Sequence, residues 1–131
     1  MLFILEDNDE RIAGFKDALG DRACHVERTV PQAIAWLQQY KDEVTLYSLD
    51  NDLVLLDYDG DEGEGWQLCE WMLAHARKAP VICHTTNSHA GHKMKFACSD
   101  AGWAFHRVVP YNDCEWIEET WIRTVKEILC Q

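Results

Sequence analysis

Residues 44–53 read VTLYSLDNDL, a short apolar run that ends abruptly in the polar group Asp50-Asn51-Asp52. An apolar run of this length between polar segments is typical of a strand buried on both faces. Similar runs occur at 2–5 (LFIL) and 80–83 (PVIC), and polar residues follow each of them. Three buried strands that end in such side chains predict a parallel sheet with one polar edge.

The stretches between these runs carry apolar residues at helical spacing. Ile12, Phe15 and Leu19 recur three or four residues apart and precede Gly20, a plausible helix stop. Four further stripes predict four more helices: Val30, Ala33, Ile34 and Leu37; Trp66, Cys69, Met72 and Leu73; Met94 and Ala97, in a helix near 90–101; and Ile117, Trp121, Val125 and Ile128. Trp66, Trp71 and Trp116 are candidates for partial exposure.

Two weaker apolar runs, at 24–28 and 103–109, complete the set of predicted strands, and residues 53–56 read as a possible strand extension inside an acidic loop, 50–65. Alternating strands and helices predict an α/β fold. We expect a three-layer, doubly wound, five-stranded parallel sheet of the flavodoxin-like or receiver-like kind, with strand order 2-1-3-4-5. The length of 131 residues matches a single domain, 1–131.

The composition limits which binding partners and which cellular compartment we expect for this protein. The chain has 23 acidic and 12 basic residues, a net charge of -11, which repels a phosphate backbone and argues against broad nucleic-acid binding. The apolar start is too short for a membrane helix and lacks a basic leader. None of the six cysteines forms a C-x-x-C pair. We therefore expect a cytoplasmic protein without membrane attachment, with reduced thiols, whose partner is a small phosphate-bearing substrate or a protein.

The polar residues that follow the predicted strands form a candidate metal site. Glu6 and Asp7 follow the first strand, and Asp50 and Asp52 follow the third. Because carboxylates a few Å apart repel one another, they stay ionised together only around a cation. A hard divalent ion such as Mg²⁺, or Mn²⁺, suits oxygen ligands and also takes phosphate oxygens. Glu6, Asp7 and Asp50 are the predicted metal ligands.

The same edge of the sheet supplies candidates for catalysis and for phosphate binding. His84 directly follows the fourth strand and is suited to proton transfer near neutral pH. With Asp50 and Asp52 it makes up the predicted catalytic set. Arg11, Thr85 and Asn87 are the predicted phosphate-binding residues, through a guanidinium, a hydroxyl and an amide.

These motifs resemble the receiver domains of bacterial response regulators: the Glu6-Asp7 pair, an aspartate after the third strand, and residues 80–85 (PVICHT). The resemblance implies that Asp7 and Asp50 hold Mg²⁺ and that Thr85 contacts a phosphoryl group. Receivers carry a lysine where this chain has Val109.

Arg107 is a candidate substitute for that lysine, although arginine and lysine are not equivalent. The position of the receiver aspartate also has an alternative. Residues 52–57 (DLVLLD) read like a receiver third strand ending in Asp57. We favour Asp50, because Asp57 would leave a much longer connection from the second helix.

A closer resemblance is to the cyclic-phosphate-processing receiver family. It rests on residues 5–8 (LEDN) with Arg11, on 48–53 (SLDNDL), and on 84–87 (HTTN) with Gly91 and Met94. It implies a phosphoesterase-like site that acts on cyclic phosphates of nucleotides or RNA ends. The chain departs from the family pattern in Thr85, where serine is usual, and in a longer acidic insertion after Leu53. A phospho-accepting receiver and a degenerate interaction module are the alternatives.

Overall fold

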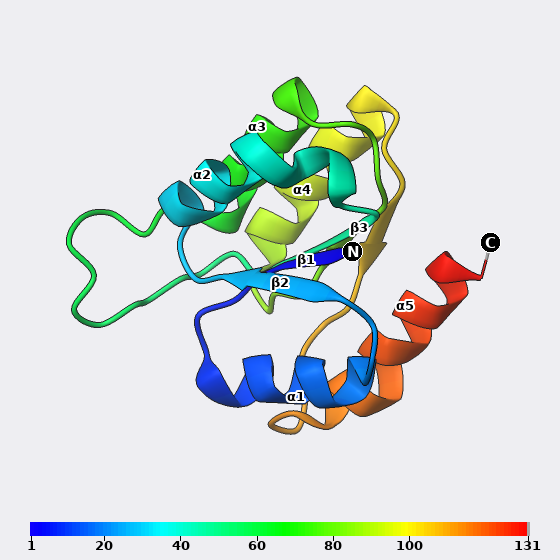
Figure 1. Ribbon diagram of the computed structural model, residues 1–131. Helices are drawn as coiled ribbons and strands as arrows, with labels where there is room; N and C mark the ends of the chain where they lie inside the picture. The colour runs from blue at the N-terminus through cyan, green and yellow to red at the C-terminus, as the bar shows by residue number, and fades with distance from the viewer. Residues whose placement is uncertain (131) are drawn as a thin grey trace.

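The computed structural model describes residues 1–130, which fold around a five-stranded, all-parallel sheet in the order β2-β1-β3-β4-β5. Helices α2, α3 and α4 cover one face of the sheet, and α1 and α5 cover the other (Figure 1). The strands are β1 (Leu2–Leu5), β2 (Cys24–Glu27), β3 (Leu46–Leu49), β4 (Val81–Cys83) and β5 (Phe105–Arg107). The helices are α1 (Asp9–Leu19), α2 (Val30–Tyr40), α3 (Gly65–His75), α4 (Ser88–Ala101) and α5 (Ile122–Leu129). The predicted fold class and strand order are confirmed.

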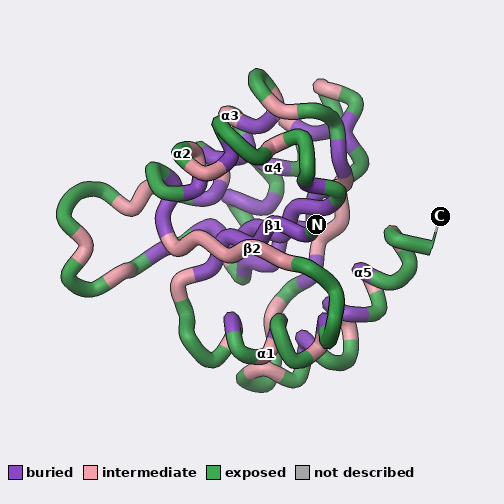
Figure 2. Tube along the Cα trace, in the orientation of Figure 1, coloured by how far each residue is buried: buried purple, intermediate pink, exposed green. Residues whose placement is uncertain are grey.

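Strands β1 and β3 are buried on both faces, which explains their uninterrupted apolar runs (Figure 2). Successive side chains of β1 point to opposite sides of the sheet. Phe3 and Leu5 therefore pack in the core beneath α2, α3 and α4, whereas Leu2 and Ile4 pack in the core beneath α1 and α5. No helix in residues 1–130 is long and apolar enough to cross a membrane.

Four predicted strands were too long. β2 ends at Glu27, β3 begins at Leu46, β4 begins at Val81, and β5 covers only Phe105–Arg107. Trp103 lies outside β5 because its backbone N–H donates to the carbonyl of Cys98 and closes the end of α4. A run of apolar residues indicates which residues are buried. Some buried residues lie beyond the ends of a strand, where they share no ladder hydrogen bonds, so the apolar run is longer than the strand.

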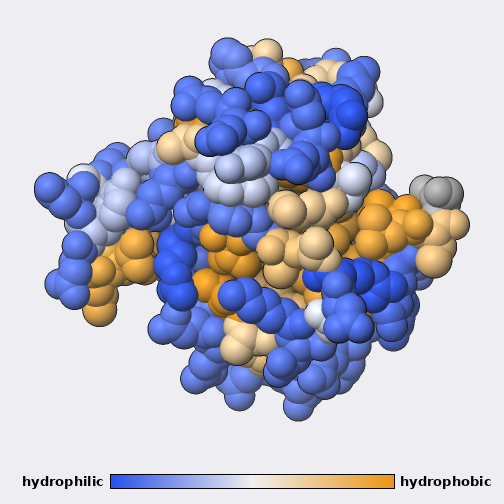
Figure 3. Space-filling view, in the orientation of Figure 1, coloured by the Kyte–Doolittle hydropathy of each residue, from blue (hydrophilic) through white to orange (hydrophobic). Residues whose placement is uncertain are grey.

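The possible strand extension at 53–56 is wrong. The structure pairs only Asp52, in an isolated antiparallel bridge with Glu64. The segment between them is a loop that projects from the sheet edge (Figure 1). Val54 and Leu56 are 66 % and 82 % exposed on this loop, which gives it an apolar margin in Figure 3. We call residues 52–64 the acidic loop.

The C-terminal helix also differs from its prediction. A π-helical turn, Ile117–Trp121, precedes α5. Trp116, a candidate for partial exposure, is fully buried, because its ring packs edge-on against Phe15 of α1. Trp66 and Trp71 are half-buried. The pattern of apolar residues could not distinguish Trp116 from a surface tryptophan, since the decisive contact comes from a helix 100 residues earlier in the chain.

Gly65 fixes the start of α3 against the site. A Cβ at this position would lie 1.8 Å from the carbonyl oxygen of Asp50, a backbone atom that has no room to move away. Gly65→Ala is therefore expected to lower the free energy of unfolding by about 3 kcal/mol or more, as measured by urea denaturation. Gly14→Ala is the control, because there a Cβ meets side-chain atoms of Ile117 rather than a backbone atom, and the terminal Cδ1 is the nearer of them. A Gly65→Ala protein as stable as Gly14→Ala would contradict this packing.

Candidate functional site

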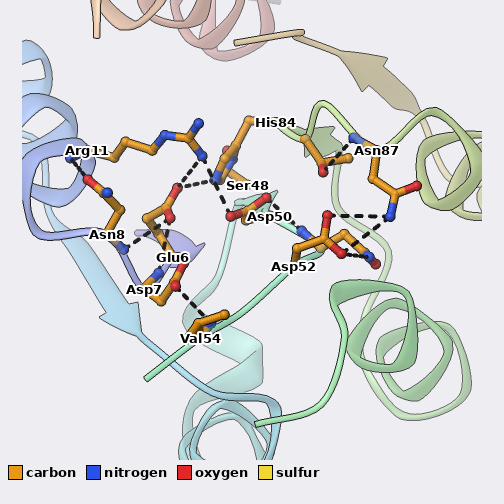
Figure 4. A network of polar contacts seen from close by, with 12 residues as sticks. Glu6, Asp7, Asn8, Arg11, Ser48, Asp50, Asp52, Val54, His84 and Asn87 are labelled. Carbon is orange, nitrogen blue, oxygen red and sulfur yellow. Dashed lines mark hydrogen bonds and ion pairs between the residues drawn. The ribbon is translucent and has the colours of Figure 1, made fainter. Parts of the chain in front are cut away.

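Carboxylates from two neighbouring strands meet at the carboxyl edge of the sheet. Leu5 pairs with Leu49 in the parallel ladder, so the residues that follow them lie side by side. Glu6, Asp7 and Asp50 each offer one carboxylate oxygen, and the three oxygens lie within 4.8 Å of one another (Figure 4). This is the span of oxygen ligands around one hard cation, whose metal–oxygen bonds are roughly 2.0–2.6 Å long. The predicted metal ligands are therefore close enough to share an ion.

Two of these carboxyl groups are buried. Glu6 is fully buried and Asp50 is 5 % exposed. Burial raises the pKa of each group to about 7, and the Arg11 guanidinium opposes the rise in both cases. Each group therefore holds its proton to a much higher pH than an ordinary carboxyl group when no metal is bound, and a divalent cation would favour the ionised form of both.

Arg11 supplies the positive charge nearest to the cluster. Its Nη1 atom lies 3.5 Å from Oε1 of Glu6 and 3.7 Å from Oδ2 of Asp50. Asn8 caps α1 by accepting from the backbone N–H of Arg11, which fixes the start of the helix. The guanidinium also lies 5.5 Å from the centre of the Trp116 ring. The predicted phosphate-binding arginine is therefore at the site, held by the acids themselves.

The substitution of Arg107 for the receiver lysine stays a prediction, because the ion pair of Asp50 is with Arg11 and Arg107 contacts Thr85 instead. The Nη2 atom of Arg107 donates to the backbone carbonyl of Thr85 at 2.7 Å, beneath Gly91 of α4. Val109 is 51 % exposed. The cation beside Asp50 comes from α1 rather than from β5.

Asp7 links the cluster to the acidic loop. Its Oδ2 atom accepts a hydrogen bond from the backbone N–H of Val54 at 2.8 Å. Arg28 donates to the backbone carbonyl of Asp7 at 2.9 Å. A groove of about 340 Å³ opens between these segments, lined by Asp7, Asn8, Asp9, Arg28, Val54, Leu55 and Leu56. It directly borders a predicted metal ligand, Asp7, and it combines apolar and charged walls.

His84 lies behind Glu6, away from solvent. It is fully buried, with Nε2 3.1 Å from Oε1 of Glu6 and Nδ1 2.7 Å from Oγ of Ser48. Burial lowers the pKa of His84 to about 4, so the ring is neutral at neutral pH. Both ring nitrogens are thus occupied within the protein. An acid–base role for His84 stays a prediction, because the groups that its ring nitrogens contact are Ser48 and Glu6.

The remaining predicted residues lie at the rim. Asp52 is exposed, and its carboxylate accepts from the side-chain amide of Asn87 at 3.3 and 3.4 Å. Asn87 also caps α4. The Thr85 hydroxyl accepts from the backbone N–H of Asn87, and Thr85 is only 1 % exposed. Asp52 is outside the carboxylate cluster, and Thr85 would have to turn outward to reach a phosphate.

The choice between the two receiver aspartates is clear in the fold. Asp50 directly follows β3, and its backbone N–H donates to the carbonyl of Leu5. Asp57 is exposed on the acidic loop, with φ of 67°. Asp50 therefore occupies the strand end.

Two residues at the site were missed from the sequence, Ser48 and Trp121. Ser48 is a fully buried hydroxyl that contacts His84, and the indole Nε1 of Trp121 donates to it at 2.9 Å. A serine inside an apolar strand was a usable signal, since buried hydroxyls require partners. Trp121 gave no such signal, because nothing local distinguishes it from a core tryptophan.

Arg11 and a metal ion would compete for the same oxygens. Arg11→Gln is expected to strengthen Mn²⁺ binding a few-fold at pH 8, where Glu6 and Asp50 are mainly ionised, because it removes a cation from the cluster. The same variant is expected to weaken inorganic phosphate binding to the Mn²⁺-loaded protein about tenfold. Calorimetry measures both constants. A fall in both affinities would show that Arg11 supports the cluster rather than competes for it.

Comparison with known proteins gives one family and one fold. The family model described as cyclic-phosphate processing receiver domain matches residues 2–100. No curated protein matches the chain by sequence.

Solved structures of receiver domains are similar over nearly the whole chain. A response regulator receiver protein from Pseudoalteromonas atlantica has a TM-score of 0.70 at 15 % identity, covering 98 % of this chain and 96 % of its own. The BeF3-activated N-terminal receiver domain of RstA from Klebsiella pneumoniae has a TM-score of 0.68 at 18 % identity, covering 99 % and 98 %. The HemR receiver domain from Leptospira biflexa has a TM-score of 0.67 at 21 % identity, covering 97 % and 92 %. At these identities the likeness concerns the fold.

Proposed function

The chain belongs to the cyclic-phosphate processing receiver domain family, and from this premise we propose that it is a metal-dependent phosphoesterase acting on cyclic phosphates of nucleotides or RNA ends. The observation that carries the proposal is the Glu6–Asp7–Asp50 cluster, whose oxygens lie within 4.8 Å and which includes two buried carboxyl groups. In this proposal one domain, residues 1–131, contains the whole site.

The three carboxylates would hold Mg²⁺ or Mn²⁺. When bound, such an ion polarises a phosphate ester and lowers the pKa of a bound water. Arg11, released from Glu6 and Asp50, would turn its guanidinium to the phosphate oxygens. His84 would keep Glu6 in place through its Nε2 contact.

The rim residues complete the proposed chemistry. Asp52 would accept a proton at its exposed carboxylate, which the Asn87 amide orients. Asn87 and Thr85 are assigned to the phosphate. The groove beside Asp7 would receive the organic part of the substrate, because Val54 and Leu56 give it apolar contact area next to the metal ligands.

A phospho-accepting receiver is the second candidate, favoured by the position of Asp50 directly after β3 and beside the Glu6-Asp7 pair. Two observations weigh against it. Asp50 is only 5 % exposed, with Oδ1 accepting from the Asn51 backbone, so a phosphodonor has poor access to it. Val109 stands where a receiver has its lysine.

Turnover separates the two candidates. With Mn²⁺ and a 2′,3′-cyclic nucleotide, the phosphoesterase is expected to release many product molecules per protein without a kinase. With acetyl phosphate, a phospho-acceptor gains at most one phosphoryl group per chain, detectable by intact mass. Asp57→Asn should leave either activity unchanged, because Asp57 is exposed on the acidic loop and is not part of the Glu6–Asp7–Asp50 cluster. Stoichiometric phosphorylation of Asp50 without turnover would overturn the phosphoesterase proposal.

A further inference from the structure

A chain of four fully buried side chains leads from the site into the C-terminal segment. The indole Nε1 of Trp121 donates to Oγ of Ser48 at 2.9 Å, Ser48 Oγ lies 2.7 Å from Nδ1 of His84, and His84 Nε2 lies 3.1 Å from Oε1 of Glu6. Figure 4 shows the part of this chain from Ser48 through His84 to Glu6. None of the four side chains is exposed to bulk solvent.

The direction of these hydrogen bonds follows from the groups themselves. An indole N–H only donates, so Ser48 accepts from Trp121. The single hydroxyl proton of Ser48 then needs an acceptor, and within residues 1–130 Nδ1 of His84 is the one that its geometry provides. A ring that accepts at Nδ1 and carries one proton has that proton on Nε2, where it points at Glu6. In the opposite tautomer, with the proton on Nδ1, Trp121 and His84 would both donate to Ser48. The buried hydroxyl proton of Ser48 would then have no acceptor.

We propose that Trp121 and Ser48 are positioning residues that fix His84 as its Nε2–H tautomer, so that His84 donates to Glu6 and holds that carboxylate ready for a metal ion. Outer partners of this kind orient metal ligands and fix histidine tautomers. Trp121 lies in the π-helical turn before α5, outside the residues 2–100 that match the family model. The C-terminal segment of this chain therefore contributes to the site through the buried hydrogen bond from Trp121 to Ser48.

The test combines the tautomer of His84 with metal affinity. Long-range ¹H–¹⁵N correlation spectra of ¹⁵N-histidine-labelled protein identify the protonated ring nitrogen, and Mn²⁺ titration by calorimetry gives the affinity. The wild type is expected to show His84 protonated at Nε2, with a hydrogen-bonded Nδ1. Ser48→Ala should move the Nδ1 resonance toward that of a nitrogen without a donor and weaken Mn²⁺ binding roughly tenfold, the lower end of the effect of outer partners.

The chain offers a matched control for Trp121. Trp116 is equally buried and also packs near the His84 ring, but its indole N–H donates to the backbone carbonyl of Asp113. Trp121→Phe is expected to weaken the Nδ1 hydrogen bond, whereas Trp116→Phe should leave the His84 spectrum as in wild type. A role in packing alone would make the two phenylalanine variants alike. Because Trp116 also contacts Arg11, the spectrum rather than the metal affinity decides this comparison.

The metal part of this inference rests on the proposed function, and the tautomer part does not. Nδ1–H protonation in wild type, equal spectra for the two phenylalanine variants, or an unchanged spectrum in Ser48→Ala would each overturn the inference. The expected tautomer and spectral changes with no Mn²⁺ binding in wild type would uphold the positioning of His84 and overturn the metal-dependent function.

Discussion

Asp50→Asn is expected to weaken Mn²⁺ binding by about a hundredfold or more. The substitution keeps the shape of the side chain and removes one of three charges from a cluster whose oxygens lie within 4.8 Å. Loss of one unit charge a few Å from a divalent ion in a partly buried site corresponds to roughly 3 kcal/mol after screening, or about two decades of affinity. Calorimetric titration at pH 8 measures the change, and hydrolysis of a cyclic nucleotide should fall with it.

Two controls make this result specific. Asp57→Asn removes the same charge from the exposed acidic loop and should leave Mn²⁺ affinity within about twofold of wild type. Asp50→Asn should also stabilise the metal-free protein above pH 7, because it removes a buried carboxyl group whose pKa burial raises to about 7. Loss of binding in Asp57→Asn instead would move the metal site to the loop, and equal binding in all three proteins would remove Asp50 from it.

Metal affinity is expected to fall steeply below pH 7, since Mn²⁺ must displace protons from Glu6 and Asp50. Both groups have a pKa of about 7 in the metal-free protein. Two protons lost on binding give a decrease of up to about a hundredfold between pH 8 and pH 6. Titrations in buffers of different ionisation enthalpy count the protons directly. A decrease below about threefold over this range would mean that neither group is protonated before binding.

The same groups predict how the stability of the metal-free protein depends on pH. For Glu6 and Asp50 the folded pKa exceeds the unfolded value near 4, so the folded state holds more protons and stability falls as pH rises from about 4.5 to 7. His84 has the opposite sign, because its pKa falls from 6.5 to about 4 and its burial as a neutral ring gains stability as pH rises through that range.

The two carboxyl groups together outweigh the histidine, so the free energy of unfolding is expected to fall by about 2–4 kcal/mol from pH 4.5 to 7. Urea denaturation at each pH measures it. Saturating Mn²⁺ at pH 8 should reverse this loss of stability. A free energy of unfolding that rises with pH throughout would contradict the burial of these carboxyl groups.

The sequence by itself determined the fold class and most of the residues at the site. Apolar runs such as 2–5 and 44–49 mark strands buried on both faces, and such strands occur in parallel sheets. Parallel strands end at one edge, so the residues after each run had to gather there. That single argument predicted the closeness of Glu6, Asp7 and Asp50, which the structure confirms. These inferences succeed because they depend on local patterns and on one rule of sheet geometry.

Only the tertiary structure decided which groups share contacts at that edge. In the structure Arg11 forms the ion pairs with the buried carboxyl groups, whereas Arg107 contacts Thr85. His84 lies behind Glu6. Trp121, near the end of the chain, donates to Ser48 in its middle. Each outcome depends on the angle and depth at which a helix packs on the sheet. The apolar pattern of a helix sets which face is buried, but it does not specify which polar atom of that face will meet an atom 73 residues away.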